Sequence, residues 1–571
     1  MNNHFNVKAT VRKNQITSFT ESIETSLLQK SAGQTGILAR YATGESYYRE
    51  YNYEALASFN NNFLDNRLAF SMNVGANVLD IEQKSHDLST SNGLNVPDYY
   101  AINNSKAQPS ISNGRSNSKV NSVFGSGDLE WKKFASVTFA LRNDWYSANP
   151  VDKASLLSHA LGVSFIFSEF TKASLPWLSF GKVFGSWGKK PRPLATYQNN
   201  FGYSTGQFLW NGNFIMSTPN AAVSPDLVGS TVRTYEAGGE LRFLKNRLGL
   251  NVVYYNEDND GEPLNVAVSG VSGFTSIATN AVHVKREGIE ITINASPVKG
   301  KDFTWDITKT FGYLIKNTVR EILGANRVLL AGGPFGTRFA RAFQEVGQDW
   351  GQLIGGGIKR NSAGMMVLNP TSGLYIRDLD KHWGSVVPKT TGGLINTLTY
   401  KDFVFNFSLD YQIGGKFFSL SENWGNFSGL LEETAATNDK GKNVREAAAS
   451  GGGVHVVGVS SVDEKTPVDK YVEAYDYFHQ FYFGQIAEPF IHDLTYVKVR
   501  EASFGYRIPV KKIGSISKFV QGATFSLIAR NPWIIYREAK NFDPSEISGV
   551  QGEDGQLPSV RSLGASLKIV F

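Results

Sequence analysis

The feature that most constrains the fold of this chain is an alternation of apolar and polar side chains at every second residue. In the terminal segment, 559–571, one face of the predicted strand is apolar and carries Leu563, Ala565, Leu567, Ile569 and Phe571. The opposite face carries Ser562, Gly564, Ser566 and Lys568. The end of a soluble sheet usually trails into polar residues, because chain ends fray and an unpaired apolar edge invites aggregation. The apolar ending therefore favours a strand that closes a barrel and turns this face to lipid.

The same alternation predicts many further strands, most of them joined by short polar turns. Single strands are predicted at 134–145, 156–170 and 177–189. Hairpins are predicted for 234–244 with 248–258, for 288–298 with 303–315, and for 392–401 with 403–414. The last three strands are 496–509, 523–536 and the terminal one, and a phase slip predicts a bulge near Arg500 and Glu501. The total is roughly sixteen strands, so we predict an all-β protein, a transmembrane antiparallel β-barrel.

Longer connections interrupt this pattern at 84–118, 190–230, 259–284 and 415–492. Short turns on one side and long loops on the other are typical of outer-membrane barrels, whose long loops are extracellular. The longest connection contains a predicted short helix at 468–483, where Tyr471, Tyr475, Phe478 and Tyr482 recur at helical spacing.

Composition agrees with a barrel and excludes several other classes. Of the 571 residues, 38 are Phe, 24 Tyr, 10 Trp and 56 Gly, which suits strands, tight turns and interfacial aromatic girdles. The absence of cysteine excludes disulfide frameworks and thiolate metal sites. A net charge of +6 from scattered basic residues predicts no nucleic-acid partner. No apolar run approaches the roughly 18 to 20 residues of a membrane helix.

The sequence offers few residues for chemistry, and we predict no enzymatic activity. Asn256, Asp258, Asp260 and Gly261 resemble the opening of a calcium loop, but Ala267 stands where the bidentate glutamate should be. An acidic hairpin tip is the better interpretation, so we predict no metal and no cofactor. The candidate substrate-binding residues are loop aromatics that can stack on sugars or peptide side chains: Tyr203, Trp210, Trp424 and Tyr475. The alternative is that these rings pack the loops together or belong to a girdle.

Several segments closely resemble the SusC/RagA family of TonB-dependent outer-membrane transporters. The closest resemblance is C-terminal, in DLTYVKVREASFGYRIP (493–509), ARNPWIIYREAKNFDP (529–544) and GQLPSVRSLGASLKIVF (555–571). Supporting segments lie upstream, in order, at 139–150, 235–258, 267–281 and 288–307. The resemblance implies a barrel of about 22 strands with a plugged lumen.

The resemblance also implies partner proteins and a location in the outer membrane. Family members import oligosaccharides or peptides across the outer membrane with energy relayed by TonB, under a SusD-like surface lipoprotein that acts as a lid. In such proteins the terminal aromatic residue, here Phe571, resembles the signal read by the insertion machinery. No signal peptide, N-terminal extension, TonB box or plug is recognisable, so we expect residues 1–571 to be the C-terminal part of a family barrel.

Two other functions remain open at this point. One is a porin-like or purely structural barrel without a plug, and the other is a soluble surface β-protein that binds glycans. The absent plug favours the first of these alternatives, whereas the lipid-suited alternation and Phe571 argue against the second.

Overall fold

The computed structural model describes most of the chain in two compact units, between which four strands are divided. The described residues are 4–25, 39–331, 339–509, 519–547, 549, 550, 552, 553, 555 and 557–571. The divided strands are β7 (Leu178–Pro191), β11 (Thr231–Phe243), β12 (Leu248–Ala267) and β13 (Ser276–Lys299).

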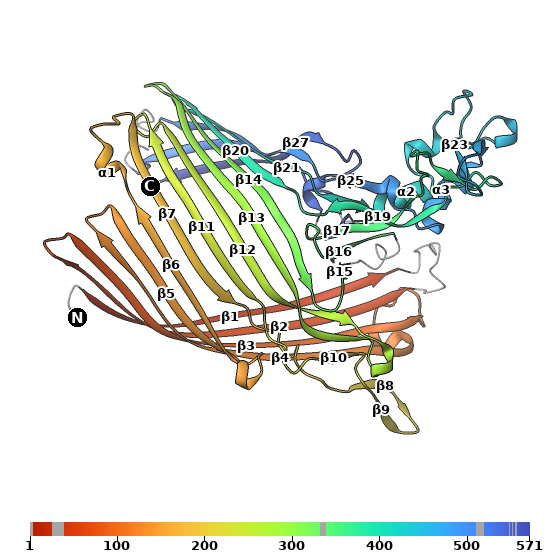
Figure 1. Ribbon diagram of the computed structural model, residues 1–571, viewed down its shortest axis with the longest axis horizontal. Helices are drawn as coiled ribbons and strands as arrows, with labels where there is room; N and C mark the ends of the chain where they lie inside the picture. The colour runs from red at the N-terminus through yellow and green to blue at the C-terminus, as the bar shows by residue number, and fades with distance from the viewer. Residues whose placement is uncertain are drawn as a thin grey trace. The chain divides into compact units, whose positions relative to one another are not determined.

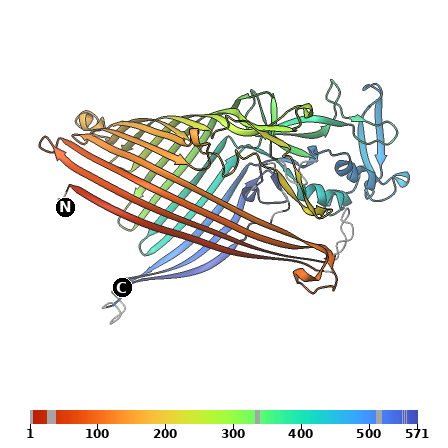
Figure 2. The same ribbon diagram turned by 90° about the horizontal axis from the view of Figure 1, so that it is seen from below.

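The first unit consists mainly of six long strands, each antiparallel to the next: β1 (Phe5–Glu24), β2 (Arg40–Phe63), β3 (Leu68–Leu94), β4 (Ser105–Trp131), β5 (Ala135–Tyr146) and β6 (Ser155–Phe165). Figure 2 shows β1 to β4 side by side, in red to orange. A small hairpin, β8 (Ser204–Trp210) with β9 (Asn213–Ser217), and the short β10 (Ala221–Val223) complete the unit.

Strands β5 and β6 show why these residues form membrane-type strands. Val137, Phe139 and Leu141 of β5 are exposed, as the period-two pattern predicts for a face turned to lipid. On the other face, the Ser136 and Ser164 hydroxyls of paired residues are hydrogen-bonded at 2.7 Å. In these strands the exposed face is apolar and the opposite face carries hydrogen-bonded polar side chains. A sheet of a soluble protein has the reverse arrangement.

The second unit contains six more long strands: β14 (Phe303–Ile322), β20 (Thr390–Tyr400), β21 (Phe403–Ile413), β26 (Tyr496–Ile508), β27 (Gly522–Arg537) and β29 (Ser562–Val570). They follow one another as antiparallel neighbours, and β13 pairs with β14. The predicted hairpins of 288–298 with 303–315 and of 392–401 with 403–414, and the three C-terminal strands, are thus confirmed. The predicted bulge is confirmed as well, because Arg500 is skipped in the register of β26 with both of its neighbours.

Three long connections of the second unit, 323–389, 414–495 and 538–561, leave the same end of these strands (Figure 1). At the opposite end, β20 and β21 are joined by only Lys401 and Asp402. The three connections fold into what we call the loop domain, which has three small sheets. They are β15 (Arg327–Ala331), β16 (Ala340–Glu345), β17 (Gln352–Ile358) and β19 (Arg377–Ser385); β18 (Val367–Leu368), β23 (Val454–Ser460) and β24 (Pro467–Val472); and β22 (Lys416–Ser419), β25 (Ile491–Asp493) and β28 (Gly552–Glu553).

Two helices, α2 (Leu420–Phe427) and α3 (Ala474–Phe483), belong to the loop domain, and the short α1 (Ser168–Thr171) lies before β7. The predicted helix at 468–483 was therefore wrong in its first part, where 468–472 form strand β24 paired with β23. Tyr471 lies on that strand and stacks on His455 at 4.5 Å between ring centroids. No helix among the described residues is long and apolar enough to cross a membrane.

Two predicted loops are also corrected. Most of 84–118 belongs to β3 and β4, and most of 259–284 belongs to β12 and β13. The calcium-like residues 256–261 lie inside the continuous strand β12, where Asp258 contacts the His283 ring at 2.9 Å. Among the residues that the structure describes, no cluster of three or more His, Asp or Glu side chains has metal-binding geometry.

Candidate functional site

The loop domain has a hydrophobic core of its own, which fixes its two helices. Phe481 of α3 and Leu420 of α2 are buried together with Phe418, Ile486 and Phe490. Helix α2 begins after Ser419, whose Oγ accepts a hydrogen bond from the Glu422 backbone N–H at 3.1 Å. Because the cap satisfies one of the free N–H groups of the first turn, the start of α2 is fixed where Glu422 falls on its inner side.

A cavity of about 950 Å³ lies in the loop domain, between α2, α3 and the last long connection. Its apolar wall is formed by side chains that include Ile358, Met366, Tyr375, Tyr477, Phe481 and Phe490. Its polar side chains include Glu422, Asn426, Glu432, Glu433, Asp439, His492 and Asn541. A concave site with an apolar wall and a few converging polar groups is the usual form of a ligand pocket.

Glu422 is the buried acidic residue of this cavity, with 7% of its surface exposed. One carboxylate oxygen, Oε2, contacts Nε2 of His492 on β25, and the other, Oε1, accepts from Asn541 Nδ2 at 2.7 Å. The three residues come from α2, β25 and the connection after β27, so all three segments must be in place to form this group.

Further charges at the cavity are fixed by neighbours in the loop domain. The Arg360 guanidinium lies 2.6 Å from a Glu488 carboxylate oxygen, and this hydrogen bond raises the pKa of Arg360. Tyr471 donates a hydrogen bond to Asp439 at 2.8 Å, which together with nearby His455 holds the pKa of Asp439 below its usual value. Arg360 and Asp439 therefore both carry their charges at neutral pH.

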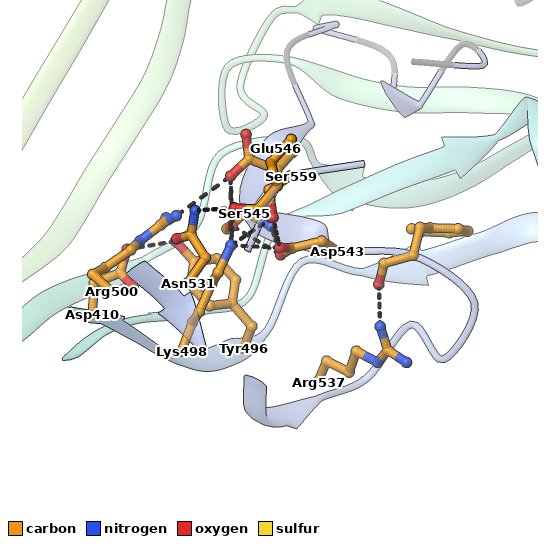
Figure 3. A network of polar contacts seen from close by, with 12 residues as sticks. Asp410, Tyr496, Lys498, Arg500, Asn531, Arg537, Asp543, Ser545, Glu546 and Ser559 are labelled. Atoms are coloured by element: carbon orange, nitrogen blue, oxygen red, sulfur yellow. Dashed lines mark hydrogen bonds and ion pairs between the residues drawn. The ribbon is translucent and has the colours of Figure 1, made fainter. Parts of the chain in front are cut away.

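A second polar cluster attaches the last long connection, 538–561, to the long strand β26 (Figure 3). Lys498 on β26 is only 1% exposed and contacts Asp543, with further hydrogen bonds to the Ser545 and Ser559 hydroxyls at 3.1 and 3.0 Å. Arg500, the bulged residue, lies 2.8 Å from Asp410 on β21 and 3.4 Å from Glu546. The bulge thus aims Arg500 at the connection that also carries Asn541 into the cavity.

The four predicted substrate-binding aromatics lie in different places. Tyr203 and Trp210 belong to the first unit, before and at the end of β8, and both are exposed, Trp210 by 74%. Trp424 packs against the hydrophobic core of the loop domain and meets Tyr482 edge-on at 6.1 Å. Tyr475 on α3 is 68% exposed, and the centroid of its ring lies 3.9 Å from the centroid of the His479 ring. None of these four side chains lines the cavity.

Phe571 directly follows β29 and is largely exposed. Leu563, Leu567 and Ile569 of that strand are exposed too, as expected for the apolar face of the terminal strand. The cavity residues were missed in the sequence, because they come from five separate stretches between 358 and 541. One signal was available: Ser419 and Glu422 have the S-x-x-E spacing of a capping box, which marks the start of α2.

Comparisons with known proteins agree on one family. The model of the family described as TonB dependent receptor-like, beta-barrel matches residues 3–445. TonB-dependent receptor P3 of Formosa agariphila is 22% identical over 487 residues, which cover 79% of this chain and 45% of that protein. TonB-dependent receptor SusC of Bacteroides thetaiotaomicron is 24% identical over 402 residues, which cover 66% of this chain and 35% of SusC.

Solved structures show the same fold. The RagAB peptide importer in its closed-closed state superposes with a TM-score of 0.75 at 16% identity, covering all of this chain (100%) and 60% of that one. A second structure, of the RagAB peptide transporter, gives a TM-score of 0.74 at 15% identity, covering 99% and 60%. This chain thus spans less than half of the curated relatives and three-fifths of these structures. It belongs to the TonB-dependent receptor β-barrel family and is an outer-membrane protein of the SusC/RagA type.

Proposed function

We propose that this chain is the barrel part of a SusC-like importer that takes up oligosaccharides or peptides across the outer membrane. In this proposal the import is powered through TonB, and a SusD-like surface lipoprotein covers the extracellular opening. The protein supplies binding and gating, without covalent chemistry or a cofactor. The similarity to a SusC receptor and to a peptide importer supports this assignment.

The observation that carries the proposal is the loop domain. Three connections at one end of the second unit's strands build a folded structure with its own core and a cavity of about 950 Å³. A barrel that merely leaks small solutes does not require so large a folded structure at its loops. A receptor does, because a rigid concave surface reduces the entropy lost when a flexible oligomer binds.

We further propose roles for the predicted aromatics. Trp210 and Tyr203 contact the lid or the substrate, since both expose a ring with a polar handle. Tyr475 does the same from the loop domain. Trp424 supports the fold of the loop domain, because it packs against its core.

The test is uptake by cells of the host strain. We would measure uptake of fluorescent oligosaccharides and peptides with the gene for this chain intact, disrupted, or intact in a tonB-deficient background. We expect uptake of one class of these oligomers to be lost in both altered strains. Uptake that persists without TonB would instead identify a porin-like barrel. Trp210→Ala and Tyr475→Ala, with Tyr99→Ala as an exposed control, would show in the same assay whether these rings contribute.

Phe571 is proposed as the assembly signal of the terminal strand. Its deletion should lower the amount of heat-modifiable protein in the outer membrane, because the insertion machinery reads the end of this strand. Phe571→Tyr, which keeps an aromatic residue at the end of this strand, is the matched control. Equal membrane yields for the deletion and for Phe571→Tyr would count against the signal role.

A further inference from the structure

We propose that the lipid-facing side of the first unit binds the phosphorylated headgroups of lipids in the outer leaflet of the membrane. The binding surface is a group of basic side chains on the neighbouring strands β1 to β4, which we call the basic belt. It consists of Lys13, Arg49, Lys84, Arg115 and Lys119. The inference concerns the lipid around the barrel, so it goes beyond the proposed import function and does not depend on the imported substrate.

The lipid-facing side can be followed from strand to strand through the register. Leu141 of β5 is one of the exposed apolar residues on this side, and the row that contains it continues through Gly125, Val74 and Ala57 to Val7 of β1. Val74 and Val7 are exposed like Leu141. Since side chains alternate along each strand, every second residue from this row lies on the same face. All five residues of the basic belt have this parity and therefore share the face of the apolar residues.

Aromatic side chains mark both ends of the apolar part of this face. Phe63 and Trp131 lie at one end, beside the short turns, and Tyr53 and Trp145 lie at the other. All four rings are exposed, as expected for aromatic girdles at the two membrane interfaces. A tilted strand crosses the apolar core of a bilayer in about 9 to 11 residues, which residues 53–63 of β2 supply.

The basic belt lies beyond the Tyr53 girdle, on the extracellular side. The turns at the opposite end, 64–67 and 132–134, are short, whereas residues 95–104 join β3 to β4 at the end of the belt. Short turns are periplasmic and longer loops extracellular in outer-membrane barrels. The belt begins roughly 5 Å beyond the apolar core, by the rise and tilt of the strands. Long basic side chains at this depth reach lipid headgroups.

Positive charge exceeds negative charge in the rows of the belt. The acidic side chains of these rows are Asp80 and Glu82 of β3. Glu82 contacts three cations at once, since its carboxylate oxygens lie 2.6 Å from Arg49, 2.8 Å from Lys84 and 3.6 Å from Arg115. One carboxylate cannot neutralise three cations. The remaining positive charge therefore complements anionic lipid headgroups.

Lys13 and Lys119 are the exposed basic side chains of the belt next to the girdle. Neither forms an ion pair with a residue that the structure describes. The ammonium of Lys13 lies 5.8 Å from the centroid of the Tyr51 ring, and Tyr51 stacks on Tyr53 at 6.0 Å between ring centroids. The girdle thus holds a cation at the level where the phosphates of neighbouring lipids lie.

The test is native mass spectrometry of the complete detergent-solubilised chain with added lipid A that carries two phosphates. Its matched probes are the same lipid without phosphates, and inorganic pyrophosphate as a free phosphate compound. We expect the dephosphorylated lipid to bind about tenfold more weakly than the phosphorylated lipid, and pyrophosphate not to displace the phosphorylated lipid. Lys13→Gln with Lys119→Gln should weaken binding of the phosphorylated lipid about tenfold as well.

Lys132→Gln with Lys133→Gln is the matched control, because it removes two exposed lysines at the opposite, short-turn end of β4 and should leave binding unchanged. Arg115→Gln is a second variant of the belt and should also weaken binding, and heat-modifiable migration on a gel verifies that each variant folds. Equal affinities for the two lipids, or equal losses in the two double-lysine variants, would overturn the proposal. Displacement of the lipid by pyrophosphate would identify a site for free phosphate compounds and would overturn the assignment to lipid.

Discussion

Lys498 shows how one residue joins the long strand β26 to the loop domain. Its side chain is nearly fully buried on β26, and its ammonium is surrounded by Asp543, Ser545 and Ser559 from the last long connection. Taking a lysine and an aspartate out of water costs several kcal/mol each, roughly, and this is repaid only when the pair stays together with its hydrogen bonds. The pair therefore specifies where the connection docks more than it adds to overall stability.

We predict that Lys498→Met destabilises the folded protein by about 3 to 5 kcal/mol, because it leaves the Asp543 carboxylate buried without its cation. The double variant Lys498→Met with Asp543→Leu should recover most of that loss, since no buried charge remains. Denaturant unfolding in detergent, followed by tryptophan fluorescence, measures both. Additive effects of the two substitutions would contradict the pairing.

The Lys498–Asp543 pair also makes the stability of the folded protein depend on pH. Burial would raise the pKa of Asp543, but hydrogen bonds from Lys498, Ser559 and Ser545 outweigh it and hold the pKa below its ordinary value of 3.8. The stabilising contribution of Asp543 is therefore complete well above pH 3.8 and is lost as the pH falls through the lower, folded-state pKa. We expect the stability gap between the native protein and Asp543→Asn to be constant from pH 8 to about pH 5 and to narrow below it. A gap that widens on acidification would show the opposite sign of the shift.

At the scale of elements, the local patterns of the sequence predicted the strands well where one face was apolar. The β13–β14 and β20–β21 hairpins and the bulge at Arg500 all follow from alternation and its interruption. Alternation fails in the polar ends of β3 and β4, where residues such as Lys84, Ser85 and His86 give both faces the same character. Helical spacing also misassigned Tyr471, because tertiary pairing with β23 decides the conformation of that stretch.

The terminal strand tests the assignment of faces. Leu567 on β29 pairs with Phe525 on β27, and both side chains are exposed. Leu567→Arg should cost about 2 to 4 kcal/mol if it lies near the bilayer midplane, and should lower the yield of folded protein in the membrane. Ser566→Arg, one residue away on the opposite face, is the matched control. The heat-modifiable fraction on an unboiled gel measures each, and equal losses would refute the assignment.

At the scale of the whole molecule, the cavity depends on segments that are distant in the sequence. Glu422, His492 and Asn541 meet only after two connections have folded against each other. No local pattern encodes such convergence, which explains why the exposed aromatics were predicted as candidates and the cavity was not. The family, by contrast, was predictable, since its C-terminal strands carry long recognisable segments.

Glu553 is the residue that ties the last connection to the start of α2, and its loss should loosen the cavity without unfolding the strands. Its buried carboxylate accepts hydrogen bonds from the Ser419 hydroxyl, the Ser421 hydroxyl and backbone N–H, and the Gly555 N–H. Because hydrogen bonds to a charged group contribute about 1.5 to 3 kcal/mol each, Glu553→Ala should release residues around 538–561 and the first turn of α2. Limited proteolysis with mass spectrometry should then find new cleavage in the loop domain, while β20, β21 and β26 stay protected.

Glu446→Ala removes an exposed glutamate from the same domain and should leave the cleavage pattern unchanged. If the Glu553 variant were cleaved only where the native protein is, the other contacts of the connection, among them the Lys498 cluster and the Asn541–Glu422 hydrogen bond, would suffice to hold it in place.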